Sequence, residues 1–216
     1  MARANLRGSL IAFEGCDKSG KTTQAAKLVG KLLDEGKQVM IVTFPDKTTP
    51  IGAIIDSYIT STRQLDDHAM HLLFSANMWE VEQEILSTLQ KGTSVVIDRY
   101  AYSSIAFSAA KECLNLEWCK QPTTGLPKPD LVCFLDVTEE VAMQRTNLNG
   151  GWNTKPLVQE KMREIFTKLS DVSWVTVPSE GTFDEVGQKL YDLVKMELDK
   201  ALKGELGKLW VEKQQE

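Results

Sequence analysis

Short apolar and β-branched runs alternate with longer amphipathic stretches along most of this chain. The runs predict strands at 9–14, 38–44, 94–98, 131–137 and 173–177. The stretches between them carry apolar residues at three- and four-residue spacing, as one face of a helix does. Strands that alternate with helices predict an α/β fold, with a mainly parallel sheet covered on both faces. Residues that follow the strands should then lie together at the carboxyl edge of the sheet, where such folds bind ligands.

Several helix boundaries are marked by ordinary start and stop signals. A helix should begin at Lys21 and end before Gly36, and a long one should begin at Asp66 or Asp67 and run to Lys91, with Gly92 as its stop. Further helices are expected at about 102–113, 139–145, 156–169 and 183–202.

Composition narrows the class of protein. The chain has 216 residues, 42% of them hydrophobic and 25% charged, and we expect one domain over 1–216. Its net charge of −5 argues against general binding to nucleic acid or a membrane surface. Its longest apolar run, 131–135, is far shorter than the ~20 residues of a membrane span.

Other features favour an intracellular protein. The apolar stretch 10–13 is too short for a signal peptide. The four cysteines have no paired spacing, which favours reduced thiols. His68 and His71 could share a helix face, but two histidines without a third ligand rarely form a metal site.

The strongest chemical signal follows the first predicted strand. Residues 15–22 read Gly-Cys-Asp-Lys-Ser-Gly-Lys-Thr and match the phosphate-binding pattern G-x-x-x-x-G-K-[ST]. Lys21 would reach the β- and γ-phosphates of a nucleotide, and the Thr22 hydroxyl would ligate Mg²⁺. The residues expected to bind the nucleoside triphosphate, in this loop and directly after it, are Gly15, Ser19, Gly20, Lys21, Thr22 and Thr23.

The loop alone leaves the class of nucleotide-binding protein open. A switch GTPase, a motor, a small-molecule kinase and a binding module without turnover would all carry it. The chain lacks the N-K-x-D element with which GTPases read guanine, and its length suits a compact kinase better than a motor.

Further motifs follow the other strands. The segment 44–47 is Phe-Pro-Asp-Lys, 98–100 is Asp-Arg-Tyr, and 71–77 lies within the long helix. Singly, each has an ordinary structural explanation, such as a surface ion pair between Asp98 and Arg99. Together with 120–122, 125–131 and 204–210, they resemble the thymidylate kinases from Arg7 to about Trp210. The sequences of these motifs resemble those of the eukaryotic and poxviral branch rather than the bacterial one.

This resemblance implies a P-loop nucleoside monophosphate kinase fold with a five-stranded parallel sheet flanked by helices and a small lid segment at about 146–156. It implies transfer of the γ-phosphoryl of ATP to dTMP, giving dTDP and ADP in the supply of dTTP for DNA synthesis, with Mg²⁺ as cofactor. It further implies an intracellular homodimer, in the cytoplasm or in a nuclear or mitochondrial pool.

The same resemblance assigns roles to residues. Lys21, Lys18, Arg99 and Asp98 would be catalytic, with Thr22 and Asp98 near the metal, Asp98 through water, and Arg145 against adenine. The residues expected to bind dTMP are Asp17, Phe44, Lys47, Phe74, Met78, Arg99, Ser103, Phe107 and Gln159.

Two positions and one segment depart from the family pattern. Lys47 and Met78 stand where the family has arginine, and Met78 offers no donor to a thymine carbonyl. The lid segment 146–155 lacks the charged and tyrosine-rich stretch expected there, whereas Lys18 supplies a cation in the phosphate loop. Two alternatives therefore stay open: a pyrimidine nucleotide or deoxynucleoside kinase with a shifted acceptor, and a nucleotide-binding protein with weak turnover.

Overall fold

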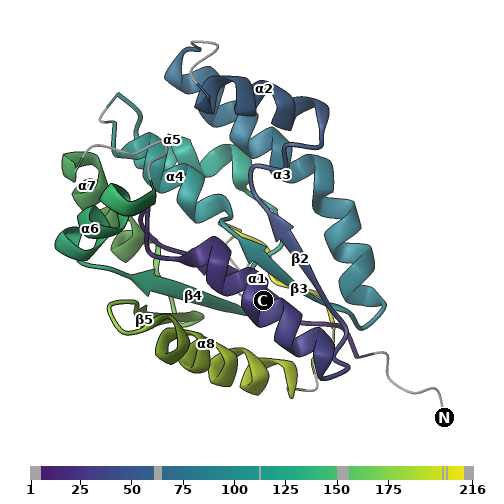
Figure 1. Cartoon of the computed structure of the whole chain (residues 1–216). Coiled ribbons are helices and arrows are strands. Elements are labelled where there is room, and N and C mark those ends of the chain that lie inside the picture. The colour runs from purple at the N-terminus through teal and green to yellow at the C-terminus, as the bar shows by residue number, and fades with distance from the viewer. Residues whose placement is uncertain are drawn as a thin grey trace.

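The computed structural model describes residues 6–60, 65–111, 113–149, 156–200, 202 and 204–211. Five strands form one sheet in the order β2-β3-β1-β4-β5, and every neighbouring pair is parallel (Figure 1). The strands are β1 (Leu10–Glu14), β2 (Val39–Thr43), β3 (Ser94–Asp98), β4 (Leu131–Asp136) and β5 (Trp174–Pro178). The predicted α/β fold is thus confirmed, and each strand lies within one residue of its expected bounds.

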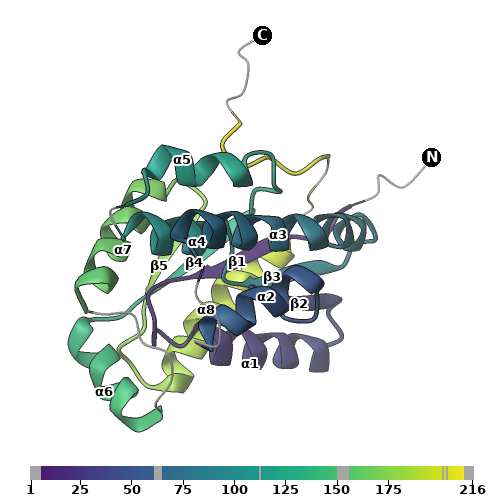
Figure 2. The same ribbon diagram turned by 90° about the horizontal axis from the view of Figure 1, so that it is seen from above.

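Helices cover both faces of the sheet (Figure 2). α1 (Lys21–Asp34) and α8 (Phe183–Leu198) lie on one face, whereas α3 (Asp67–Gln90), α4 (Ala101–Ala109) and α7 (Pro156–Leu169) lie on the other. β1 lies between these two layers of helices. Alternate side chains of a strand point to opposite faces, so β1 contributes to the cores on both sides of the sheet. Leu10 and Ala12 belong to the core under α3, α4 and α7, and Ile11 and Phe13 to the core under α1 and α8.

The helix ends differ modestly from the predicted ones. Asp66 caps α3 by accepting a hydrogen bond from the backbone N–H of His68 at 2.9 Å. α4 ends at Ala109 and α8 at Leu198, both earlier than expected, whereas α6 (Glu139–Asn149) continues beyond Arg145.

Three elements were not predicted: the helices α2 (Pro50–Ile59) and α5 (Leu116–Lys120), and the short 3₁₀ turn η1 (Gln121–Thr123). α2 packs so closely on the loop before it that a Cβ on Gly52 would lie 1.7 Å from the carbonyl oxygen of Asp46. The side chain of Asn77 on α3 also holds this loop, accepting from the Asp46 N–H at 2.8 Å and donating to Thr49 Oγ1 at 2.8 Å.

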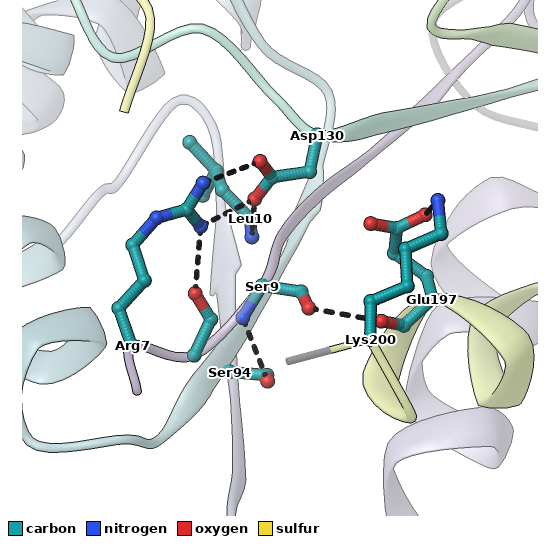
Figure 3. Close-up of polar contacts among 8 residues, drawn as sticks. Arg7, Ser9, Leu10, Ser94, Asp130, Glu197 and Lys200 are labelled. Atoms are coloured by element: carbon teal, nitrogen blue, oxygen red, sulfur yellow. Dashed lines mark hydrogen bonds and ion pairs between the residues drawn. The ribbon is translucent and has the colours of Figure 1, made fainter. Parts of the chain in front are cut away.

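Polar contacts fasten the strands at their amino ends (Figure 3). The Arg7 guanidinium binds both carboxylate oxygens of Asp130, at 2.8 and 2.7 Å, and Asp130 Oδ2 also accepts from the Leu10 N–H at 2.8 Å. The Ser9 N–H donates to Ser94 Oγ at 2.9 Å. These bonds join β1, β3 and the start of β4 at the edge opposite the phosphate loop.

Two segments that carried the family resemblance pack against each other. The Gly125 N–H donates to the Leu209 carbonyl at 3.0 Å, and the Leu209 N–H returns a bond to Leu126 at 2.8 Å. The Trp210 indole N–H donates to Thr123 Oγ1 at 3.0 Å. The end of the described chain therefore covers the η1 turn and the loop before β4.

Candidate active site

The phosphate loop has the backbone shape that its glycines predict. Gly15 has φ +143° and lies so close to β4 that a Cβ would be 2.4 Å from the Leu135 carbonyl oxygen. Gly20 has φ +94° and precedes the first turn of α1. Lys18 also lies in the left-handed region, at φ 62°. The loop therefore turns tightly and leads into the amino end of α1, where free backbone N–H groups favour an anion.

Lys21 is drawn into the loop, with only 3% of its surface exposed. Its ammonium donates to the Cys16 carbonyl at 2.6 Å and to Ser19 Oγ at 3.1 Å. Burial, reinforced by the positive charge of Arg99, lowers the pKa of Lys21 to about 7. A phosphate in the loop would stabilise the charged amine, so the arrangement suits an anionic ligand.

A cavity of about 620 Å³ lies above this loop. Arg145 is on its wall, where its guanidinium donates to the carbonyls of Lys18 at 3.0 Å and Ser179 at 2.5 Å. The cavity is also lined by residues of the phosphate loop and of the first turn of α1, namely Asp17, Lys18, Ser19, Gly20, Lys21, Thr22 and Thr23. The cavity thus brings together Arg145 and most residues expected to bind ATP.

A second cavity, of about 200 Å³, lies under α3 and α4 and is mostly apolar. Phe74 and Phe107 meet edge to face in its wall, with ring centroids 6.3 Å apart. The expected dTMP residues that line it are Asp17, Phe44, Phe74, Met78, Arg99, Ser103 and Phe107. Sequence reasoning missed Tyr58, Ile59 and Met162, which also line it, because α2 was not predicted and Met162 resembled any core residue of α7.

Asp17 and Arg99 line both cavities and form their common wall. The Arg99 guanidinium lies 3.1 Å from Asp17 Oδ1. Arg99 itself has φ 67°, and its N–H donates to the Phe13 carbonyl at 3.0 Å. A cation and a carboxylate thus stand where a ligand in one cavity would meet a ligand in the other.

Asp98 supplies a carboxylate suited to a cation. It is 1% exposed, and within the described part of the chain neither of its oxygens has a hydrogen-bond partner. It pairs with Phe13 across β1 and β3, so it ends β3 beside the start of the phosphate loop. A buried carboxylate without donors is costly, and a hydrated divalent cation would relieve that cost.

The described residues hold no group of three or more histidine, cysteine or acidic side chains arranged for a metal. Nucleotide phosphates and water usually complete the shell of Mg²⁺, so Asp98 and the Thr22 hydroxyl fit a nucleotide-bound magnesium ion.

Two expected acceptor residues do not line the second cavity. Lys47 is exposed and forms an ion pair with Asp56 at 2.6 Å, beside a separate groove between β2 and α3. Gln159 instead contacts Asp17 from α7. Within the lid segment, 150–155 lie outside the described residues, whereas 146–149 are the last residues of α6.

His68 and His71 have structural contacts. His71 is fully buried on α3, with its ring nitrogens 2.9 Å from Ser108 Oγ and 2.8 Å from the Cys119 carbonyl. His68 lies by Asp66 at the helix start.

No helix in the described part of the chain is both long and apolar enough to span a membrane.

Known proteins resemble this chain along most of its length. The model of the family described as thymidylate kinase matches residues 13–190. The thymidylate kinase of Danio rerio is 41% identical over 208 residues, covering 94% of this chain and 98% of the relative. That of Schizosaccharomyces pombe is 42% identical over 200 residues, covering 90% and 94%.

A solved structure leads to the same family. The thymidylate kinase of Candida albicans has a TM-score of 0.82 to this chain at 32% sequence identity, covering 94% of this chain and 98% of that one. This chain belongs to the thymidylate kinase family.

Proposed function

We propose that this chain transfers the γ-phosphoryl group of ATP to dTMP, giving ADP and dTDP, and so supplies a precursor of dTTP. The observation that carries this is the common wall of Asp17 and Arg99 between a phosphate-loop cavity and an apolar cavity lined by aromatic rings. A kinase whose acceptor is a nucleoside monophosphate needs this arrangement, because its two substrates must meet phosphate to phosphate.

Phosphoryl transfer to a phosphate oxygen requires positive charge in the site rather than a general base. The acceptor oxygen belongs to a phosphate and is already anionic, so the obstacle is to bring two polyanions together and to stabilise the moving phosphoryl group. Lys21, from within the loop, would hold the β- and γ-phosphates, with Lys18 as a second cation. Arg99 would hold the acceptor phosphate from the common wall. Such fixed charges act strongly in a site from which water is excluded.

Magnesium would be held at the donor side. Thr22 and Asp98 would hold Mg²⁺, Asp98 through water, and the ion would neutralise charge on the phosphates of ATP. The isolated buried carboxylate of Asp98 supports this role.

The apolar cavity would take the nucleoside of dTMP. Phe74 would stack on the thymine ring, while Phe44, Met78, Ser103 and Phe107 would surround it. Asp17, held in place by Gln159, would accept a hydrogen bond from the 3′-hydroxyl of dTMP. In the other cavity, Arg145 would lie against adenine.

Met78 favours a second candidate function, a kinase of similar fold with a broader choice of pyrimidine acceptors. Its side chain is 2% exposed and lies in the acceptor cavity, where it packs but cannot donate a hydrogen bond. Discrimination between thymine and other pyrimidines would then depend more on shape than on polar contacts.

We also propose a homodimer that acts inside the cell, in the cytoplasm or in a nuclear or mitochondrial pool, as the family resemblance implies. The segment 146–156 would serve as a lid over the donor site. Light scattering of the purified chain tests the dimer.

A coupled assay of ADP release tests the function. Each acceptor is offered with ATP and Mg²⁺: thymidine, dTMP, dUMP, dCMP and no acceptor. Turnover with dTMP well above all others supports the main proposal. Equal turnover with dCMP supports the second candidate, turnover with thymidine supports a nucleoside kinase, and ATP binding without turnover with any acceptor contradicts all three.

A further inference from the structure

A buried acid precedes the phosphate loop. Glu14 is the last residue of β1, in the otherwise apolar strand Leu-Ile-Ala-Phe-Glu, and its exposed fraction is 0%. Burial raises its pKa to about 7. Among the described residues, its side chain lines neither of the two cavities. A carboxyl in this place is costly unless its hydrogen bonds are satisfied, so its partners show what it does.

Within the described residues, the Glu14 side chain accepts three hydrogen bonds, and all three come from two residues at the start of α4, Tyr100 and Ser103. One oxygen, Oε1, accepts from the backbone N–H of Tyr100 at 2.9 Å and from that of Ser103 at 3.2 Å. The other, Oε2, accepts from the Ser103 hydroxyl. Glu14 therefore binds the segment between β3 and α4 from a strand that is far away in sequence.

These partners form the pattern of a helix cap. Tyr100 is the N-cap residue of α4 and Ser103 its third residue, and Tyr100 supplies no side-chain cap. In an ordinary capping box, two side chains of the same segment satisfy these two N–H groups. Here a single carboxylate from β1 satisfies both, so the first turn of α4 is fixed to the strand that leads into the phosphate loop.

The segment held in this way carries two groups of the acceptor site. Arg99 directly precedes Tyr100 and has a left-handed backbone, which is unfavourable for a residue other than glycine. Hydrogen bonds on both sides hold it there, from the Arg99 N–H to Phe13 and from the Tyr100 N–H to Glu14. Ser103, which lines the acceptor cavity, is held through both its N–H and its hydroxyl.

We propose that Glu14 is a positioning residue for the acceptor: by capping α4 from β1, it sets Arg99 and Ser103 in the geometry that binds the acceptor phosphate and nucleoside. The choice of dTMP as acceptor rests on the proposed function above. The role of Glu14 depends only on the placement of Arg99 and Ser103.

Glu14→Gln tests this role in assays at about pH 8.5, where a carboxyl with a pKa of about 7 is ionised, because the amide keeps the size of the side chain but loses the charge and one acceptor oxygen. We expect kcat/KM for dTMP to fall by about tenfold or more, the typical effect of a lost charged hydrogen bond. The Kd for ATP, measured without acceptor, should change far less, because the Glu14 side-chain hydrogen bonds within the described residues go to Tyr100 and Ser103 and none goes to the phosphate loop. Circular dichroism and Tm report on folding.

Asp130→Asn is the matched control, since Asp130 is also a carboxylate that accepts a backbone N–H of β1, but at the amino edge of the sheet. It should lower Tm and leave kcat/KM for dTMP unchanged. A loss in Glu14→Gln that is equal for ATP and dTMP, or no kinetic change at all, would overturn the proposal.

Two further variants keep the test decisive. If Glu14→Gln does not fold, Glu14→Asp retains the charge but withdraws the carboxylate, and the same selective loss for the acceptor is expected. In an Arg99→Ala background, Glu14→Gln should cost less than in the wild type, because residues that act through each other are not additive. Full additivity contradicts a role through Arg99. If wild type uses another acceptor instead of dTMP, the proposed function fails, and these comparisons are made with that acceptor.

Discussion

Gln159 holds Asp17 with both ends of its side-chain amide. Its Oε1 accepts from the Asp17 backbone N–H at 3.0 Å, and its Nε2 donates to Asp17 Oδ2 at 3.0 Å. The other carboxylate oxygen faces the Arg99 guanidinium. α7 thus fixes the orientation of a carboxylate that lines both cavities.

Asp17→Asn should impair dTMP use far more than ATP binding. The amide keeps the size of the side chain but loses the negative charge that would accept the sugar hydroxyl, at a cost of roughly 1–2 kcal/mol. The measurements are KM for dTMP and Kd for ATP. Gln159→Glu is a companion variant, because it sets a like charge beside Asp17 and should also act on dTMP. A loss confined to ATP would place Asp17 on the donor.

Lys21→Met should abolish turnover without unfolding the protein. Lys21 has a lowered pKa, about 7, so the unfolded chain, which keeps its proton up to about 10.5, binds more protons between those values. The contribution of Lys21 to the free energy of unfolding therefore rises with pH from about 7 to 10.5. Below pH 7 the buried lysine is charged in the folded protein, and its full destabilising effect is present.

The methionine variant lacks this cost. Its unfolding free energy without nucleotide should equal or exceed that of wild type at pH 7, and the difference should shrink toward higher pH. Denaturant titrations at several pH values measure it. A variant that is less stable than wild type at every pH would show that Lys21 supports the fold instead.

Asp98→Asn should separate metal binding from folding. Both oxygens of this buried carboxylate lack hydrogen-bond partners among the described residues, so an amide should leave Tm in metal-free buffer unchanged or higher. Turnover should fall at least tenfold, with a higher Mg²⁺ concentration needed for half-maximal rate, as loss of roughly 1.5–3 kcal/mol of charged interaction predicts. A lower Tm with an unchanged Mg²⁺ dependence would contradict the metal role.

Met78→Arg tests the acceptor pocket. The new guanidinium could donate to a thymine carbonyl, which is worth roughly 1.5–3 kcal/mol, or about 10- to 100-fold in kcat/KM for dTMP. Because Met78 is 2% exposed, the free protein should lose some stability when it buries the charge. The test compares kcat/KM for dTMP and dCMP in both proteins. Unchanged selectivity would mean that residue 78 does not face the base.

Much of this architecture follows from local sequence signals. The apolar runs predicted all five strands, and Gly15, Gly20 and Lys21 predicted the loop, because tight turns and phosphate binding demand those residue types. α2 escaped prediction because its sequence, Pro-Ile-Gly-Ala-Ile-Ile-Asp-Ser-Tyr-Ile, is apolar nearly throughout and carries a proline and a glycine near its start.

Tertiary contacts were beyond the reach of the sequence. Glu14 is an acid in a strand pattern, and only the fold shows that its partners lie on α4. The family resemblance placed Lys47 among the residues that bind dTMP, yet Lys47 pairs with Asp56 of the helix that was not predicted. The ordered matches to one family carried the assignment of the acceptor side.

The Arg99–Asp17 ion pair has a consequence for how the two nucleotides influence each other. In the proposed site the acceptor phosphate competes with Asp17 for the Arg99 guanidinium, so dTMP bears the cost of opening the pair. Both residues also line the donor cavity, so an ATP phosphate that contacts either of them then meets a pair that dTMP has already opened. Thermodynamic linkage makes this benefit reciprocal: dTMP raises the affinity for ATP by the same factor by which ATP raises the affinity for dTMP. An ion pair in the common wall of the two cavities thereby becomes a source of substrate synergism.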